Sequence, residues 1–185
     1  MIEDVLTDAG RRMDKSVEAA KHEFTTIRTG RASAALLDRL QVSAYGTKMP
    51  VNQLATISVP EPRLLTITPF DKSIMKDIER SIQESDLGLT PSNDGQVIRL
   101  PIPQLTEERR KELVKQVRHM AEEGRVAARN VRRDAVHHLK KLEQDGDAGA
   151  DDVHRAEDRL QKVTDEHVQR IDAALKAKEA EIMEV

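Results

Sequence analysis

Apolar residues recur at intervals of three and four through the first part of the chain. The series is Ile2, Leu6, Ala9, Met13, Val17, Ala20, Phe24 and Ile27. This spacing places the residues on one face of an α-helix. Gly30 follows as a C′ residue, the position just beyond a helix at which glycine is favoured. The pattern therefore predicts a long amphipathic helix that ends shortly before residue 30.

Two further apolar stripes with the same period follow residue 104. One is Leu113, Val117, Met120, Gly124, Ala127, Val131, Ala135, His138 and Leu142, and the other is Val153, Ala156, Leu160, Val163, His167, Ile171, Ala174 and Ile182. Thr106 is a suitable N-cap for the first of these helices, and the Gly-rich segment 145–150 separates it from the second. Long helices with one apolar stripe each can bury it only against one another, which predicts a three-helix bundle.

The middle of the chain has a different period. All seven prolines lie between residues 50 and 103, and a proline inside a helix costs about 3 kcal/mol. Apolar and polar residues alternate there with a period of two, which predicts strands around residues 40–44, 57–59, 65–67 and 98–102. Ile74, Ile78 and Ile82 instead predict one short helix. This segment is predicted to be a small, mostly β, α/β domain.

The order of these elements implies an insertion. The predicted class is α+β, with residues 1–30 and 104–185 forming the three-helix bundle and residues 31–103 the inserted domain. Only two short segments join the domains, and their Gly and Pro residues suit a hinge of defined geometry. The candidate hinge residues are Thr29, Gly30, Arg31, Pro101, Ile102, Pro103 and Gln104. The alternative is two docked domains without functional motion.

Composition narrows the class of protein. Of 185 residues, 34% are charged and 38% hydrophobic, with no Cys and three aromatic residues. The missing Cys excludes a disulfide framework, a thiol nucleophile and a Cys-based zinc site. No apolar run is long enough to span a membrane, and residues 1–13 do not resemble a signal peptide. We therefore expect a cytoplasmic protein without membrane association.

Enzyme and cofactor signatures are missing from the sequence. There is no phosphate-binding P-loop, no G-x-S-x-G and no H-E-x-x-H. The six histidines lack the spacing of a metal site: His137 and His138, adjacent on a helix, point about 100° apart. The sequence therefore predicts a protein that is not an enzyme and has no cofactor, catalytic residue or metal site.

Basic residues form a line on the second predicted helix. The line consists of Lys111, Lys115, Arg118, Arg125, Arg129 and Arg132, with Arg133 beside it. Most members precede a stripe residue by two, which places them about 200° from the core. Residues 106–141 contain eleven Lys or Arg against six Asp or Glu. The line suits phosphate groups, and the scarcity of aromatics favours structured RNA. The alternative is an ordinary solvated helix face.

Five segments resemble the bacterial ribosome recycling factors in order and position. These are Ile27–Ser33, Tyr45–Thr47, Ser85–Leu89, Leu105–Arg110 and Arg129–Asp134. The resemblance covers essentially the whole chain. It implies an L-shaped molecule of two domains that acts as a monomer.

The resemblance also implies a function. The family binds the large ribosomal subunit of a post-termination complex. Together with elongation factor G, which hydrolyses GTP, it splits the ribosome and releases mRNA and tRNA. By motif match, Arg28, Arg31, Arg129, Arg132 and Arg133 would contact ribosomal RNA. From the residues alone, a coiled-coil adaptor or a general chaperone of structured RNA are the competing functions.

Overall fold

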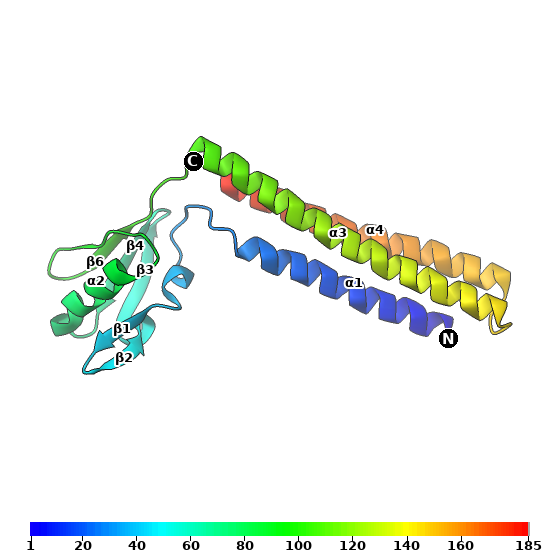
Figure 1. The fold of residues 1–185 in the computed structure, drawn as a ribbon, viewed down its shortest axis with the longest axis horizontal. Coiled ribbons are helices and arrows are strands. Elements are labelled where there is room, and N and C mark those ends of the chain that lie inside the picture. The colour runs from blue at the N-terminus through cyan, green and yellow to red at the C-terminus, as the bar shows by residue number, and fades with distance from the viewer. Residues whose placement is uncertain (185) are drawn as a thin grey trace. The chain divides into compact units, whose positions relative to one another are not determined.

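The structure is a computed structural model that describes residues 1–184. It divides into two compact units: unit 1 consists of residues 1–28 with residues 106–185, and unit 2 of residues 29–105. The unit boundaries, 28/29 and 105/106, thus each lie two residues from the predicted positions 30/31 and 103/104. Figure 1 shows the helices of unit 1 and the mixed elements of unit 2.

Unit 1 is a bundle of three helices that lie side by side (Figure 1). They are α1 (Ile2–Thr25), α3 (Glu107–Gln144) and α4 (Ala150–Met183). Thr106 caps α3, because its Oγ1 accepts a hydrogen bond from the Arg109 N–H at 3.1 Å. After α3, Gly146 adopts φ +76°, and the Asp147 N–H donates to the Leu142 carbonyl at 2.9 Å. This arrangement closes the helix C-terminus and turns the chain into α4.

The buried faces of the bundle follow the predicted stripes with a small rotation. On α3 the buried residues include Ala128 and Leu139, whereas the predicted Ala127 is half-buried and the predicted His138 is exposed. The prediction of His138 as a stripe residue was therefore wrong. The rotation reflects where α1 and α4 pack against α3, which the apolar period of one helix does not determine.

One buried polar contact joins α1 to α4. His167, only 5% exposed, places Nδ1 2.6 Å from the Val163 carbonyl oxygen and Nε2 2.6 Å from Asp14 Oδ1. Arg170 donates to the same Asp14 oxygen at 3.2 Å. A carbonyl oxygen can only accept, so Nδ1 of His167 donates to Val163, and the contact of Nε2 with Asp14 joins α4 to α1.

Unit 2 contains two antiparallel sheets and one α-helix. The strands are β1 (Gln41–Ala44), β2 (Thr47–Pro50), β3 (Ala55–Glu61), β4 (Leu64–Pro69), β5 (Ser92–Asn93) and β6 (Ile98–Pro101), and the helix is α2 (Met75–Glu84). Short 3₁₀ helices are η1 (Ala34–Leu37), η2 (Val51–Gln53) and η3 (Lys72–Ile74). One sheet is the β1–β2 hairpin, and the other has the order β3-β4-β6-β5. Strands β2 and β5 were not predicted, since neither has an alternating apolar pattern.

The core of unit 2 is aliphatic. Fully buried side chains include Leu37, Val42, Leu65, Ile67, Ile78, Ile82, Ile98 and Leu100. The predicted face of Ile74, Ile78 and Ile82 is buried, and α2 packs against β1. These contacts give unit 2 a core of its own, separate from that of unit 1.

The segment that follows α1 differs from the prediction. Helix α1 ends at Thr25 with Thr26 as its C-cap, so Gly30 is not the C′ residue of the helix. Gly30 nevertheless has φ +77°, and a Cβ at this position would lie 3.2 Å from Leu105 Cγ. Its left-handed backbone therefore serves the path of the connecting segment instead of the helix end.

Candidate nucleic-acid interface

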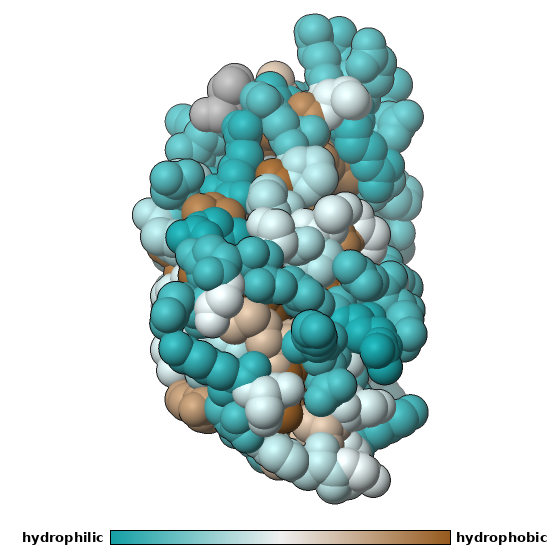
Figure 2. Space-filling model, turned by 90° about the vertical axis from the view of Figure 1, so that its left-hand side faces the viewer, coloured by the Kyte–Doolittle hydropathy of each residue, from teal (hydrophilic) through white to brown (hydrophobic). Residues whose placement is uncertain are grey.

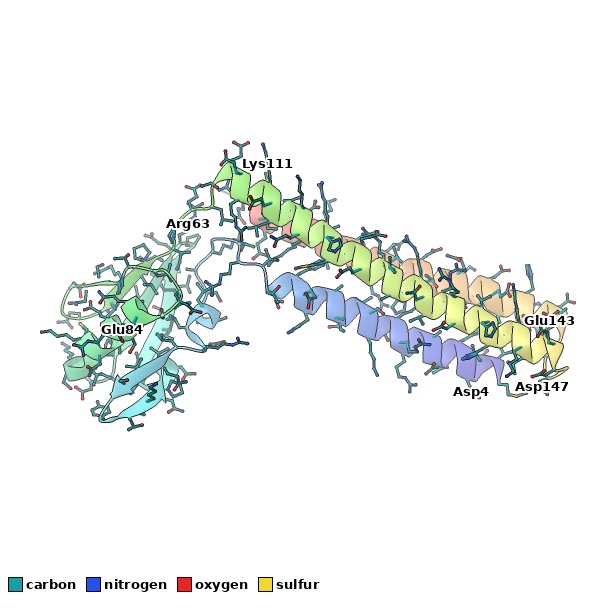
Figure 3. All side chains as sticks on the ribbon, in the orientation of Figure 1. Asp4, Arg63, Glu84, Lys111, Glu143 and Asp147 are labelled. Carbon is teal, nitrogen blue, oxygen red and sulfur yellow. The ribbon has the colours of Figure 1, made fainter. Side chains whose placement is uncertain are left out.

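Helix α3 is the only net-positive helix of the bundle. It contains eleven Lys or Arg and seven Asp or Glu, whereas α1 has four against six and α4 has six against nine. Lys111 lies at the beginning of α3 and Glu143 at its end (Figure 3). The positive charge of unit 1 is thus concentrated on one element, as expected for a surface that binds phosphate.

Two members of the basic line connect helices. Arg118 Nε donates to Glu179 Oε1 of α4 at 2.6 Å, and Arg125 Nη1 donates to Asp172 Oδ1 at 2.6 Å. The Arg125 side chain is only 19% exposed. Burial opposes the charge of Arg125, but its hydrogen bonds to Glu122 and Asp172 outweigh this and raise its pKa. The predicted placement of Arg125 on the solvent face opposite the core was therefore wrong, whereas the Arg118 side chain is 63% exposed although it reaches α4.

A simple geometric reason explains this difference. Arg118, Arg125 and Arg132 are seven residues apart, and a straight α-helix drifts by about 20° per seven residues. The series therefore moves round α3 toward α4 instead of running parallel to the helix axis. Arg132 is accordingly half-buried, not opposite the core as predicted.

The other residues of the basic line differ in whether a nearby carboxylate neutralises their charge. Lys111 Nζ lies 3.5 Å from Glu107 Oε1, and Arg129 Nη1 lies 3.7 Å from Glu122 Oε1. Both are exposed ion pairs, which contribute little and exchange easily for a phosphate. Within residues 1–184, Lys115, Arg132 and Arg133 have no carboxylate within ion-pair distance. These three cations remain available to an external anion.

Arg133 also borders a shallow hollow between α3 and α1. The hollow has a volume of about 350 Å³ and is lined by Arg12, Arg133, Asp134, His137 and His138. Arg12 Nη2 donates to Asp134 Oδ2 at 3.1 Å, which fixes its position beside Arg133. The sequence did not indicate Arg12, because it is 122 residues from Asp134 along the chain.

The opposite charge gathers at the end of the bundle that contains the α3–α4 turn. Residues 1–8 and 134–160 contain eleven Asp or Glu and four Lys or Arg. Asp4, Glu143 and Asp147 all lie at this end (Figure 3). A polyanion is therefore repelled from the turn and attracted to the middle of α3.

Arg28 and Arg31 flank the boundary between the units. Both residues are exposed. Arg28 is the last residue of the first segment of unit 1, and Arg31 follows Gly30 in unit 2.

The candidate hinge residues are held to different degrees within unit 2. Pro101 belongs to β6, and the Ile102 N–H donates to the Arg63 carbonyl at 2.8 Å. The Ala32 N–H likewise donates to the Pro62 carbonyl at 2.7 Å. Both connecting segments are thus attached to the β3–β4 turn.

Neither a metal site nor a membrane-spanning helix is found in the part of the chain that the structure describes. No group of three or more His, Asp or Glu is arranged to hold a metal ion within residues 1–184. Over the same residues, no helix has the length and hydrophobicity that a membrane span requires.

Comparisons with known proteins give a consistent result. A family model described as "Ribosome recycling factor" matches residues 20–183. The ribosome-recycling factor of Rubrobacter xylanophilus is 62% identical over 180 residues, covering 97% of each chain. That of Halalkalibacterium halodurans is 57% identical over 185 residues, covering 100% of each chain.

Two solved structures share the fold. A solution structure of the ribosome recycling factor has a TM-score of 0.71 and 43% identity, over 100% of this chain and 98% of the other. The T. thermophilus ribosome recycling factor, in a structure with E. coli elongation factor G on the E. coli post-termination complex, has a TM-score of 0.63 and 45% identity, over 100% of both chains. With its bundle, its inserted β unit and these matches, the chain belongs to the ribosome recycling factor family.

Proposed function

We propose that this protein recycles ribosomes in the cytoplasm. It binds the large subunit of a post-termination ribosome through ribosomal RNA. With elongation factor G, which hydrolyses GTP, it separates the subunits and releases mRNA and tRNA. The protein itself acts as a monomer without a cofactor and catalyses no reaction.

This proposal rests above all on the set of unpaired cations on α3, in a chain that belongs to the ribosome recycling factor family. Lys115, Arg132 and Arg133 present positive charge without a carboxylate partner among the described residues. An Arg guanidinium can donate two parallel hydrogen bonds to a phosphate, and a phosphate contact releases counterions from RNA. Lys111, Arg129, Arg28 and Arg31 extend the proposed contact surface, whereas Arg118 and Arg125 support it by fixing α3 on α4.

The test compares equal changes of charge at two places. Arg132→Ala and Arg133→Ala remove unpaired cations, whereas Arg159→Ala removes a cation paired with Glu3 at the acidic end of the bundle. Binding to purified large subunits is measured over a salt series. We expect each α3 substitution to weaken binding and to reduce the slope of log affinity against log salt by about one. Arg159→Ala should leave both unchanged.

The outcome decides between the proposed function and its competitors. Equal binding to large subunits and to free structured RNA would indicate a general RNA chaperone. Unchanged affinity and slope for the Arg132→Ala/Arg133→Ala double variant would contradict the RNA contact. Failure of the unsubstituted protein to separate post-termination ribosomes with elongation factor G would contradict recycling itself.

The segments around Gly30 and Pro103 carry a second part of the proposal, that they act as a hinge between the units. Gly30→Ala forces a side chain onto a left-handed backbone and against Leu105, whose Cγ is 3.2 Å from the added Cβ. Gly88→Ala is the matched control, because Gly88 has φ +68° and an added Cβ meets nothing within 4 Å. Recycling should fall more than subunit binding only for Gly30→Ala. Equal effects of the two substitutions would contradict the hinge.

A further inference from the structure

Two exposed histidines of α3 border the hollow between α3 and α1 and lie outside the contact surface proposed above. The hollow of about 350 Å³ is lined by Arg12, Arg133, Asp134, His137 and His138. Adjacent residues of a helix point about 100° apart, yet both imidazole rings border this hollow, with their centroids 6.5 Å apart. The fold thus brings two titratable rings beside an arginine from each of two helices.

The hollow has a polar lining, like most of the surface around it. In the face drawn in Figure 2, hydrophobic residues occur only in small separate areas between hydrophilic ones. All five residues that line the hollow are Arg, Asp or His. A ligand there is therefore held by charge and hydrogen bonds instead of by burial of apolar surface.

The charge of the lining depends on the protonation of the histidines. Asp134 is the one carboxylate of the lining, and it accepts a hydrogen bond from Arg12 at 3.1 Å. Two arginines against one aspartate give a net charge of +1, and protonation of both rings gives +3. Among residues 1–184, Arg133, His137 and His138 have no carboxylate within ion-pair distance. The hollow is thus a cationic site whose charge rises as pH falls.

The next charged groups on the two helices do not cancel this charge. On α1, Asp8 lies one helical turn from Arg12 and is paired with Arg11. On α3, Lys141 follows His137 by one turn and adds a further cation. The nearest free charge beyond the lining is therefore positive.

Two other exposed histidines differ in this respect. His119 Nε2 lies 3.0 Å from Glu123 Oε1, and His154 Nε2 lies 3.8 Å from Asp158 Oδ2. A carboxylate beside an imidazole provides within the protein the counter-charge that a phosphate would supply. His119 and His154 are thus suitable controls for the two rings of the hollow.

The hollow lies where the charge along the bundle changes sign. The unpaired Arg132 and Arg133 precede the two histidines on α3, and the acidic residues Glu143 and Asp147 follow them toward the turn (Figure 3). Protonated histidines extend the basic surface by about one helical turn toward the acidic end. An RNA strand along α3 then meets one additional phosphate site.

We propose that this hollow binds a phosphate group of an RNA backbone, and that protonation of His137 and His138 sets the strength of the contact. Arg12 and Arg133 hold the phosphate from α1 and α3, and the protonated rings donate N–H groups to its oxygens. Because an anion favours the protonated ring, binding takes up protons. Affinity is therefore greatest at low pH and falls as pH rises through the range in which histidine titrates. The inference rests on the proposed function, since the RNA is that of the large subunit.

The first test measures binding to purified large subunits between pH 6 and pH 8 at constant salt. We expect the unsubstituted protein to bind about tenfold more tightly at pH 6 than at pH 8, as uptake of less than one proton on average would produce. His137→Asn/His138→Asn cannot take up these protons and should lose most of this dependence, so that the two proteins differ most at pH 6. His119→Asn/His154→Asn should keep the profile of the unsubstituted protein.

Three outcomes of this test overturn the inference: a flat profile of the unsubstituted protein, an unchanged profile of His137→Asn/His138→Asn, and equal losses in this variant and the control. None of them contradicts the proposed function, because large subunits are still bound. Failure of the unsubstituted protein to bind large subunits at any pH would instead contradict the proposed function. Thermal unfolding of each variant at both pH values checks that the bundle is intact.

The second test asks whether α1 takes part in the contact. Arg12→Gln/Asp134→Asn removes the ion pair of the hollow, and Arg11→Gln/Asp8→Asn removes an exposed ion pair outside it, so neither variant changes the net charge. At pH 6 the first variant should reduce the slope of log affinity against log salt by about one, because it loses a phosphate contact, and the second should not. Equal slopes for the two variants overturn the contact with α1 and with it the inference.

The third test separates an RNA phosphate from a free phosphate ion. NMR of the protein with 15N-labelled histidine rings follows His137 and His138 at pH 6, while a short double-stranded RNA or inorganic phosphate is added at constant ionic strength. We expect the RNA to shift both signals at a lower phosphate concentration than the inorganic ion. A response to inorganic phosphate alone would show a site for a small anion, and no response to either would show no site. Both outcomes overturn the inference.

Discussion

The two units are stabilised by different kinds of core. In unit 1, α3 contributes Ala121, Gly124, Ala128 and Ala135 to the buried face, and both buried polar residues of the described chain, Thr164 and His167, lie on α4. The core of unit 2 consists mostly of larger side chains, Leu, Ile and Val, with Ala44 and Ala55 as its buried alanines. Small residues let helices approach closely but bury less apolar surface for each residue. The bundle should therefore be sensitive to added atoms, and unit 2 to deleted ones.

The largest expected effect follows from deletion in unit 2. Ile67 is fully buried on the central strand β4, and Ile67→Ala should destabilise unit 2 by about 2–5 kcal/mol, because it leaves a cavity. Hydrogen exchange of the full chain should show lost protection in residues 29–105 alone. Val59→Ala, at an exposed position, should change stability by less than about 0.5 kcal/mol. Equal loss of protection in both units would show that the two cores do not unfold separately.

The next largest effect on stability is expected from adding atoms to the core of the bundle, the reverse of the deletion in unit 2. A Cβ on Gly124 would lie 3.0 Å from Ala20 Cβ and 3.3 Å from Ile171 Cδ1, so the three helices meet at this point. Gly124→Ala should cost about 1–3 kcal/mol through overpacking, despite the better helix propensity of alanine. Gly10→Ala, where nothing lies within 4 Å, should stabilise α1 by about 0.5–1 kcal/mol. Urea denaturation gives both values, and a stabilising Gly124→Ala would contradict the close approach.

A smaller effect is expected from the ion pairs that join helices. Arg125→Ala removes hydrogen bonds from a largely buried guanidinium to Glu122 and Asp172 and should cost about 1 kcal/mol. Arg129→Ala removes only an exposed pair and should change stability by less than about 0.5 kcal/mol. Thermal unfolding compares the two variants. Equal losses of stability in the two variants would show that the contact of Arg125 with α4 adds nothing to the free energy of unfolding.

The smallest effect is a pH dependence in unit 2. The N–H groups of Val97 and Gln96, followed by Arg99, hold the pKa of Asp94 well below its usual range. A lowered pKa contributes stability above the pKa of the unfolded state, near 4, and this stability is lost as pH falls through the folded value. Asp94→Asn should therefore reduce the acid sensitivity of unit 2 below pH 4, measured by hydrogen exchange. An unchanged acid profile would contradict this assignment.

The sequence predicted the elements of both units, because most of their helices and strands have a clear apolar period. It predicted the capping role of Thr106, the break at residues 145–150 and the buried face of α2 for the same reason. It did not predict β2 or β5, whose residues are mostly exposed and show no alternation.

The candidate site was less predictable than the fold. The line of cations on α3 could be read from spacing, but their partners could not, because Glu179 and Asp172 are 61 and 47 residues away along the chain. The division into paired and unpaired arginines depends on where α4 packs. Arg12 beside Arg133 is likewise a product of tertiary structure.

The uneven distribution of charge along the bundle has a consequence for how the protein arrives at its target. With an acidic turn at one end and cations along the middle of α3, unit 1 carries a permanent electric dipole. In the field of a polyanion, this dipole experiences a torque that turns the acidic end away before any contact forms. Since the Debye length is about 8 Å at physiological salt, this alignment acts only over the final approach. Orientation of the bundle is thus selected during encounter, before any single arginine meets its phosphate.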